Sequence, residues 1–200
     1  MMSQSFLESI KKRRSIYGIS KEPVRSNDEL EKLVEEAVMH TPSAFNSQSA
    51  RVVLLLGEKH NKLWDITEET LKAIVKEDSF ASTAEKMASF RSGYGTVLFF
   101  EDENVIEGLQ KQFESYKDKF PQWSQHSSGM LQFVIWTALE LEGYGASLQH
   151  YNPLIDEKVG REWGIPASWT LIAQMPFGKP TAGPNDKSFE PLEKRVQVFK

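Results

Sequence analysis

The sequence of 200 residues contains no cysteine. This absence excludes disulfide bonds, thiolate catalysis and zinc sites with cysteine ligands. The sequence also lacks any run of about eighteen apolar residues, the length that a membrane-spanning helix requires, and its first residues show no apolar segment of signal-peptide length. We therefore expect a soluble, cytoplasmic protein without a membrane partner.

An excess of positive charge is missing as well. The net charge is −4 and the isoelectric point is about 5.7, whereas nucleic-acid-binding domains normally carry a basic stripe. The patterns G-x-G-x-x-G, G-x-x-x-x-G-K-[ST] and G-x-S-x-G are absent, which disfavours a Rossmann domain, a P-loop NTPase and an α/β-hydrolase. The four histidines are scattered without metal-ligand spacing, so neither nucleic acid nor a metal is an expected partner.

Hydrophobic residues make up 40% of the sequence, enough for a packed core, and their periodicity predicts one α+β domain over residues 1–200. The pattern predicts helices over residues 5–14, 27–39, 61–75, 105–116, 130–142 and 153–163. It predicts buried strands over residues 51–56, 96–100 and 169–175, a loop over 176–187, and a short terminal strand within 190–200.

Some of these segments carry stronger expectations. The strand 51–56 is rich in β-branched and other apolar residues, so we expect it at the centre of the sheet, buried on both faces. The helix 130–142 is apolar nearly all round, which indicates a place in the core or in a subunit interface. From their composition, the stretches 80–93 and 116–125 are interpreted as mobile lids.

Three short segments carry candidate chemistry. Arg13, Arg14 and Ser15 follow the first predicted helix; arginine forks beside a hydroxyl suit a phosphate group, although cations at a helix C-terminus are also common without any ligand. In the segment from Thr41 to Gln48, the amides of Asn46 and Gln48 match the alternating acceptors and donor of a flavin pyrimidine edge. The same composition is also that of an ordinary turn.

The third segment is the break after the long apolar helix, from Gly143 to His150. Its glycines are consistent with a simple helix C-cap, in which glycine adopts a left-handed conformation. The functional alternative is that backbone N–H groups become available to a ligand where the helix ends.

The order and spacing of these segments resemble the FMN-dependent nitroreductase family across the whole length of the chain. The matching elements are Arg13-Arg14-Ser15, the Pro42-Ser43-x-x-Asn46-Ser47-Gln48 pattern, the octet from Ala146 to Pro153, and Phe177-Gly178-Lys179-Pro180. The resemblance implies a nitroreductase-like sandwich, with a central, mostly antiparallel sheet flanked by helices. It also implies an intertwined homodimer with FMN at the subunit interface.

The resemblance further implies the cofactor-binding residues. Arg13, Arg14 and Ser15 would contact the phosphate, the ribityl chain or the pyrimidine edge, and backbone N–H groups around Gln149 and His150 would lie near flavin N5. Ser43, Asn46 and Gln48 would reach the flavin, with the Pro42–Ser43 part expected from the partner subunit. Lys187 stands where the family has a phosphate-binding lysine, and Arg195 is the candidate to replace a second arginine, because Phe189 occupies the usual position.

By the same resemblance, NAD(P)H would reduce the flavin and a nitroaromatic or quinone-type acceptor would then reoxidise it, a ping-pong hydride transfer that requires no protein acid or base. Besides Phe189, Tyr17 departs from the family pattern by replacing a basic residue, and Ser49-Ala50 departs from it by replacing Pro-Trp. The alternative is a non-enzymatic flavin-binding or regulatory protein that has kept the pocket. A third reading is a plain α+β interaction domain in which the motifs are coincidental.

Overall fold

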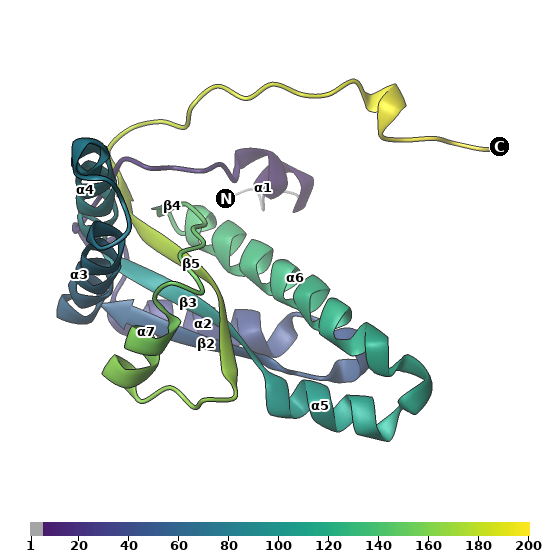
Figure 1. Cartoon of the computed structure of the whole chain (residues 1–200). Helices are drawn as coiled ribbons and strands as arrows, with labels where there is room; N and C mark the ends of the chain where they lie inside the picture. Colours follow the sequence, from purple (N-terminus) through teal and green to yellow (C-terminus); the bar gives the residue numbers. More distant parts are fainter. Residues whose placement is uncertain (1–5) are drawn as a thin grey trace.

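The computed structural model describes residues 6–200 and consists of helices packed on both faces of an antiparallel sheet (Figure 1). The helices are α1 (Phe6–Lys12), α2 (Asn27–His40), α3 (Glu58–Lys72), α4 (Glu77–Arg91), α5 (Glu103–Gln112), α6 (Phe120–Leu141) and α7 (Asp156–Trp163). The strands are β1 (Ile19–Ser20), β2 (Ala50–Leu56), β3 (Gly95–Asp102), β4 (Gly145–Ala146) and β5 (Trp169–Pro180). The predicted α+β class is confirmed.

The sheet has the strand order β1-β5-β3-β2, with β4 also paired to β5, and all of these pairs are antiparallel. Strand β3 lies inside the sheet, and every one of its residues is buried. Its side chains alternate between two cores: Val97 and Phe99 face one, and Leu98 and Phe100 face the other. This alternation makes the molecule a sandwich with helices above and below one sheet.

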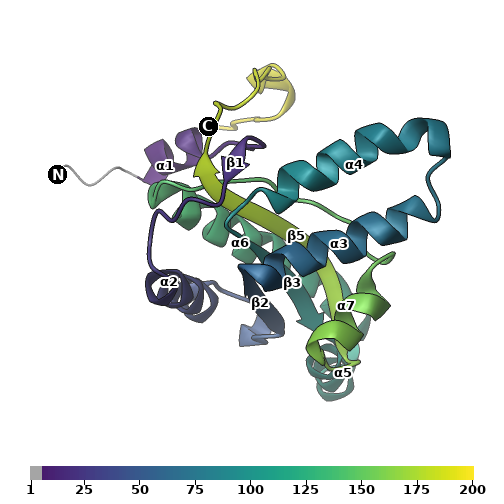
Figure 2. The same ribbon diagram turned by 90° about the vertical axis from the view of Figure 1, so that its left-hand side faces the viewer.

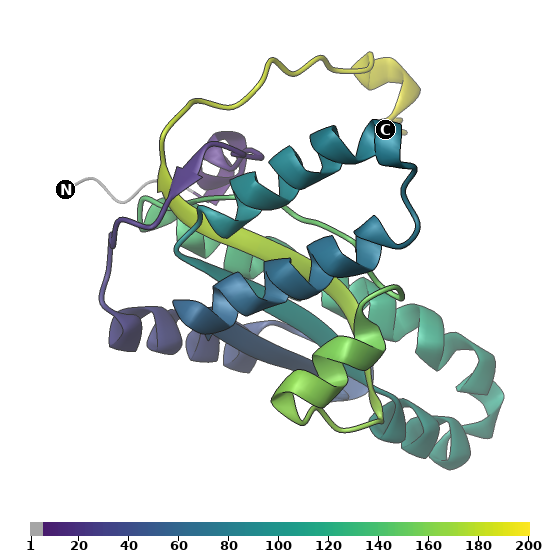
Figure 3. The ribbon, with the colours of Figure 1, turned by 60° about the vertical axis from the view of Figure 1, so that its left-hand side comes forward.

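The two cores are closed by different helices. Helices α2 and α6 cover one face, through residues such as Leu30, Ile135 and Leu139. Helices α3, α4 and α7 cover the other, through residues such as Trp64 and Phe90 (Figures 2 and 3). The burial of these large side chains, each worth about 1.5–3 kcal/mol, is the main driving force for the arrangement.

Helix α6 is longer than predicted. It spans 22 residues and begins at Phe120, with Pro121 in its first turn, where the missing backbone N–H of proline carries no penalty. One face is buried, through Leu131, Ile135 and Leu139, whereas Met130, Val134 and Leu141 are exposed. The chain by itself therefore does not bury this helix all round, and its burial in a subunit interface, the other expected place, stays a prediction.

Two other predictions are corrected, and the structure gives the conformation of the two stretches expected as lids. Strand β2 is half-buried at the edge of the sheet and not central, because β3 takes the position between β5 and β2. The stretch 80–93 lies in helix α4 up to Arg91, with Met87 and Phe90 buried, and the stretch 116–125 lies in a 3₁₀ segment and the start of α6. That either stretch moves as a lid stays a prediction. Strand β5 extends to Pro180 and so includes the first five residues of the predicted loop 176–187.

The tail contains no strand among the described residues, only one 3₁₀ turn at Leu192–Lys194. The helix predicted over 5–14 is found as α1, and residue 5 lies outside the described residues. No helix within residues 6–200 is long and apolar enough to cross a membrane.

Candidate functional site

The Arg13–Ser15 segment lies directly beside the break that follows α6. Ser15 pairs with Ala146 in a parallel bridge, and the N–H of Ile16 donates to the carbonyl oxygen of Ala146 at 2.9 Å. A Cβ at position 145 would lie 2.6 Å from the Ile16 side chain, so only glycine permits this approach. The first and third sequence motifs therefore form one continuous surface.

Arg13 stacks on a tryptophan that the sequence analysis did not select. Its guanidinium carbon lies 4.4 Å from the centroid of the Trp136 ring, within the range of a cation–π contact. Arg13 Nε and Trp136 Nε1 are both buried and have no hydrogen-bond partner among the described residues. Leaving a buried donor unpaired costs about 1–3 kcal/mol. A bound group with acceptor oxygens fits here, since it would satisfy these donors.

The sequence held little signal for Trp136. It sits at a core-like position of an apolar helix, where a tryptophan is normally interpreted as packing. Only the arginine stacked on it distinguishes its role.

Arg14 ties this segment to α6 and to the tail. Its backbone N–H donates to both carboxylate oxygens of Glu140 at 2.9 Å, and its guanidinium donates to the carbonyl oxygen of Asn185. Burial raises the pKa of Glu140 to about 7, and the Arg14 N–H and the charges of Arg13 and Arg14 oppose that rise. Asn185 contacts Arg14, and Lys187 follows Asn185 by two residues. The backbone of Lys187 therefore lies within about 7 Å of the backbone of Asn185.

Arg195 is not brought to the same place. It is exposed in the tail, which leads away from β5 and past α1 (Figure 1). Lys187 is also exposed, and its ammonium lies 5.0 Å from the ring centroid of Phe189.

Gln149 holds its segment on β5. Its N–H donates to the carbonyl oxygen of Gln174 at 2.7 Å, and its side-chain amide donates to Ser147 Oγ at 3.1 Å. The N–H of Gln149 is therefore engaged within the chain, and the approach of this segment to flavin N5 stays a prediction. Successive N–H groups of an extended segment point in opposite directions, so the N–H of exposed His150 is the one directed away from the sheet.

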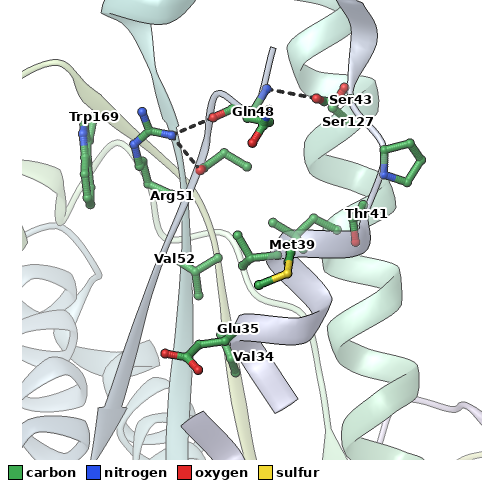
Figure 4. A pocket seen from close by; sticks show the side chains of 14 residues that line it. Val34, Glu35, Met39, Thr41, Ser43, Gln48, Arg51, Val52, Ser127 and Trp169 are labelled. Atoms are coloured by element: carbon green, nitrogen blue, oxygen red, sulfur yellow. Dashed lines mark hydrogen bonds between the residues drawn. The ribbon is translucent and has the colours of Figure 1, made fainter. Parts of the chain in front are cut away.

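Ser43, Asn46 and Gln48 lie on a tight loop at the other end of α6. Ser43 Oγ accepts the N–H of Gln48 at 3.0 Å, and Ser127 Oγ of α6 accepts the N–H of Ala44 at 3.2 Å. Asn46 and Gln48 are exposed. Figure 4 shows this loop at the rim of a cavity of about 690 Å³ between α2, α6 and the edge of β2. The amides are thus available to a ligand.

The two groups of candidate residues do not meet within one chain. The loop is attached to α6 at Ser127, whereas Arg14 is attached to it at Glu140. At 1.5 Å per residue, these two positions of the helix are roughly 20 Å apart. The structure therefore brings together Arg13, Arg14, Ser15 and the Gln149–His150 segment, and separately Ser43, Asn46 and Gln48.

A buried carboxyl group supports the loop from below. Ser49 Oγ donates to Glu101 Oε2 at 2.6 Å, while Glu101 Oε1 is buried without a partner among the described residues. Burial raises the pKa of Glu101 to about 7, and the Ser49 hydrogen bond opposes that rise. Of the nearby charged residues, Arg51 is bonded to Asp102 at 3.0 Å. The sequence indicated only acidic residues at the end of a strand.

Within residues 6–200, no group of three or more histidine or acidic side chains is arranged to hold a metal ion. The available chemistry consists of fixed positive charge, unpaired N–H donors and side-chain amides. Such a set binds an anionic, hydrogen-bonding organic ligand rather than a cation.

Comparison with known proteins agrees with this arrangement. The model of the nitroreductase family matches residues 10–179. The chain is 38% identical over 198 residues to HBN1 of Saccharomyces cerevisiae (98% of this chain, 97% of that protein) and 36% identical over 188 residues to nitroreductase FRM2 of the same yeast (92% and 93%).

Among solved structures, nitroreductase CinD from Lactococcus lactis in complex with nicotinic acid superposes with a TM-score of 0.92 at 42% identity, covering 98% of this chain and 100% of CinD. The complex of CinD with 4-nitrophenol gives a TM-score of 0.89 at 41% identity, with the same coverage. The predicted nitroreductase-like sandwich is confirmed.

The buried Glu101 generates a prediction on stability against pH. Its folded pKa of about 7 lies above the ordinary value of 4.5, so the folded state binds more protons between these pH values. The free energy of unfolding should therefore fall as pH rises from about 4.5 to 7, by about 3 kcal/mol from this group, and then level off. Glu101→Gln keeps an acceptor for Ser49 and should remove this part of the slope.

Urea denaturation at several pH values measures the slope. Glu85→Gln, which removes an exposed carboxylate of α4, is the matched control and should leave it unchanged. Equal slopes for the wild type and Glu101→Gln would show that the pKa of Glu101 is not raised in the folded protein.

Proposed function

The chain belongs to the nitroreductase family, and from this premise we propose that it is an FMN-dependent oxidoreductase. In this proposal it uses NADH or NADPH to reduce nitroaromatic or quinone-type acceptors. The observation that carries the proposal is the Arg13–Trp136 stack, whose two buried donors lack partners beside the Gln149–His150 segment. The nitroreductase family typically binds FMN, and a phosphorylated flavin offers the acceptors that these donors lack.

Different residues are proposed to bind different parts of the cofactor. Arg13, Arg14, Ser15 and Lys187 would hold the phosphate and ribityl chain, since guanidinium and ammonium groups are strong phosphate donors. The amides of Asn46 and Gln48, steadied by Ser43, would pair with the pyrimidine edge. The outward N–H of His150 would face flavin N5, while Gln149 fixes its position on β5. Arg195 is proposed as a further phosphate contact, although within one chain the tail carries it away from Arg13.

When bound, FMN supplies the redox chemistry, by taking hydride from NAD(P)H and giving it to the acceptor. The protein supplies binding, orientation and fixed positive charge, chiefly from Arg13. CinD is solved with nicotinic acid and with 4-nitrophenol. These two ligands support the proposal that one space admits a nicotinamide ring and a nitroaromatic in turn, which is a ping-pong order.

The separation of the half-sites supports a homodimer. The two groups of residues sit roughly 20 Å apart along α6, so a second chain is proposed to bring its Ser43–Gln48 loop to the Arg13 group of the first. The exposed residues of α6 offer an apolar face for this contact.

The tail also supports an intertwined arrangement. Its exposed apolar residues are Phe189, Leu192, Val196, Val198 and Phe199. The outer edge of β2 has no strand partner among the described residues, and an open strand edge readily pairs with another chain. We place the tail of one copy along the β2 edge of the other, beside the cavity of Figure 4.

A visible absorption spectrum of the purified protein, recorded before and after addition of NADH or NADPH under nitrogen, tests the function. Flavin bands that bleach with a reduced nucleotide are expected. Bands that persist with both nucleotides would favour the non-enzymatic flavin-binding protein. A colourless protein that does not take up added FMN would refute the proposal.

Arg13→Ala should weaken FMN binding by roughly 1.5–3 kcal/mol, the value of a hydrogen bond to a charged group. Fluorescence titration with FMN measures the change in dissociation constant. Lys12→Ala removes a positive charge from the neighbouring exposed position and serves as the control, with little expected effect. Unchanged FMN affinity in Arg13→Ala would remove Arg13 from the site.

The dimer is tested by light scattering on the flavin-bound protein, for which a dimeric mass is expected. The double variant Val198→Ser/Phe199→Ser should raise the dimer dissociation constant by about tenfold or more, because it removes apolar surface from the contact. The double variant Glu190→Gln/Glu193→Gln alters the same tail without that loss. A monomeric mass with flavin bound would contradict the proposed assembly.

A further inference from the structure

The Ser43–Gln48 loop has an unusual backbone. Phe45, Asn46 and Gln48 have φ angles of 57°, 51° and 49°, in the left-handed region. Asparagine tolerates this region, but a bulky phenylalanine rarely occupies it. Each such residue is strained and persists only where its surroundings enforce its conformation. The loop therefore stores strain next to the two amides that face solvent.

Aromatic rings from outside the loop surround Phe45. The ring centroids of Phe113, Tyr116, Phe120 and Trp123 lie 5.0, 5.9, 5.3 and 5.7 Å from that of Phe45, and the Trp123 ring is stacked on it at an interplanar angle of 15°. We call these four residues the aromatic cage. They come from the end of α5, the following 3₁₀ segment and the first turn of α6.

The aromatic cage differs from the hydrophobic core in that two of the rings in contact remain partly exposed. Phe45 remains 50% exposed and Tyr116 48% exposed, so burial of apolar surface accounts for only part of the contact. Aromatic pairs at these distances stabilise the contact beyond the burial of their surface. Several such pairs around one ring act against the strain at Phe45.

The polar contacts of the loop act on other atoms. The N–H of Asn46 donates to the carbonyl oxygen of Ser43 at 2.9 Å, and that of Ser47 donates to Ala44 at 3.1 Å. The side chains of Asn46 and Gln48 make no hydrogen bond within the described residues, so nothing but the backbone directs them. The Phe45 ring packs the middle of the loop on the rest of the fold, and Ser127 Oγ holds the adjacent N–H of Ala44.

We propose that Phe45 is a positioning residue for the flavin. Held in the aromatic cage, it keeps the loop left-handed and so presents the amides of Asn46 and Gln48, already oriented, to the donor–acceptor edge of the pyrimidine ring. The inference rests on the proposed function, because it assigns to Phe45 a share in the affinity for that cofactor. A loop that is already ordered avoids the entropic cost that a flexible loop would incur on binding the flavin.

A series at position 45 separates the ring from the strain. Phe45→Leu and Phe45→Gly should each weaken FMN binding about tenfold or more, the scale of ordering one or two side chains. Glycine adopts a positive φ without strain, so its failure to preserve affinity would show that the ring itself is required. Phe45→Tyr keeps the ring and should bind FMN within about twofold of the wild type. Phe80→Leu, at a half-buried phenylalanine of α4, is the matched control and should retain FMN affinity.

A double-mutant cycle distinguishes positioning from general stability. If Phe45 acts through the loop amides, Phe45→Leu should have little further effect on FMN affinity in a variant that already carries Asn46→Ala and Gln48→Ala. Additive losses would overturn the proposal, as would full FMN affinity in Phe45→Gly. Circular dichroism and Tm confirm that each variant is folded. A wild-type protein that binds no FMN would refute the function itself, whereas normal binding by the wild type and Phe45→Leu alike would refute only the role of Phe45.

Discussion

Helix α6 sets the distance on which the rest of the site depends. Its buried face closes one core against the sheet, so its position is not free to change. Its N-terminal half holds the Ser43–Gln48 loop through Ser127, and its C-terminal half holds the Arg13–Arg14 segment through Trp136 and Glu140. Because a helix rises only 1.5 Å per residue and does not bend easily, one chain carries two half-sites roughly 20 Å apart.

Several of the energetic costs that this fold tolerates lie at those half-sites. Arg13 Nε and Trp136 Nε1 are buried donors without partners, Glu101 is a buried carboxyl group with one unpaired oxygen, and the left-handed backbone lies at Phe45 and its neighbours. Along β3 from Val97 to Phe100, by contrast, the apolar side chains alternate between the two cores and serve packing. Local conflicts of this kind are expected where a structure is built to bind something, since the bound group or the surrounding contacts offset them.

The sequence predicted elements well where one physical signal was strong. Helix α2 begins at Asn27 as expected, because Ser26 and Glu29 form a capping box that marks its start. The first ten residues of α6 were missed because they are mostly polar and form contacts at the aromatic cage and the loop. Strand β2 was predicted at the centre of the sheet because the apolar run of its sequence does not distinguish an edge strand from one that pairs on both sides.

The sequence by itself determined the α+β class, the family pattern and the identity of the residues that carry charge and amides, since these depend on residue type and local spacing. Only the tertiary structure decided which of them meet: Ser15 beside Ala146, Arg13 on Trp136, and the Asn46–Gln48 amides at the far end of α6. It also revealed Glu101, Trp136 and the aromatic cage. Their significance lies in burial and in contacts between segments distant in sequence, which no local pattern of residues encodes.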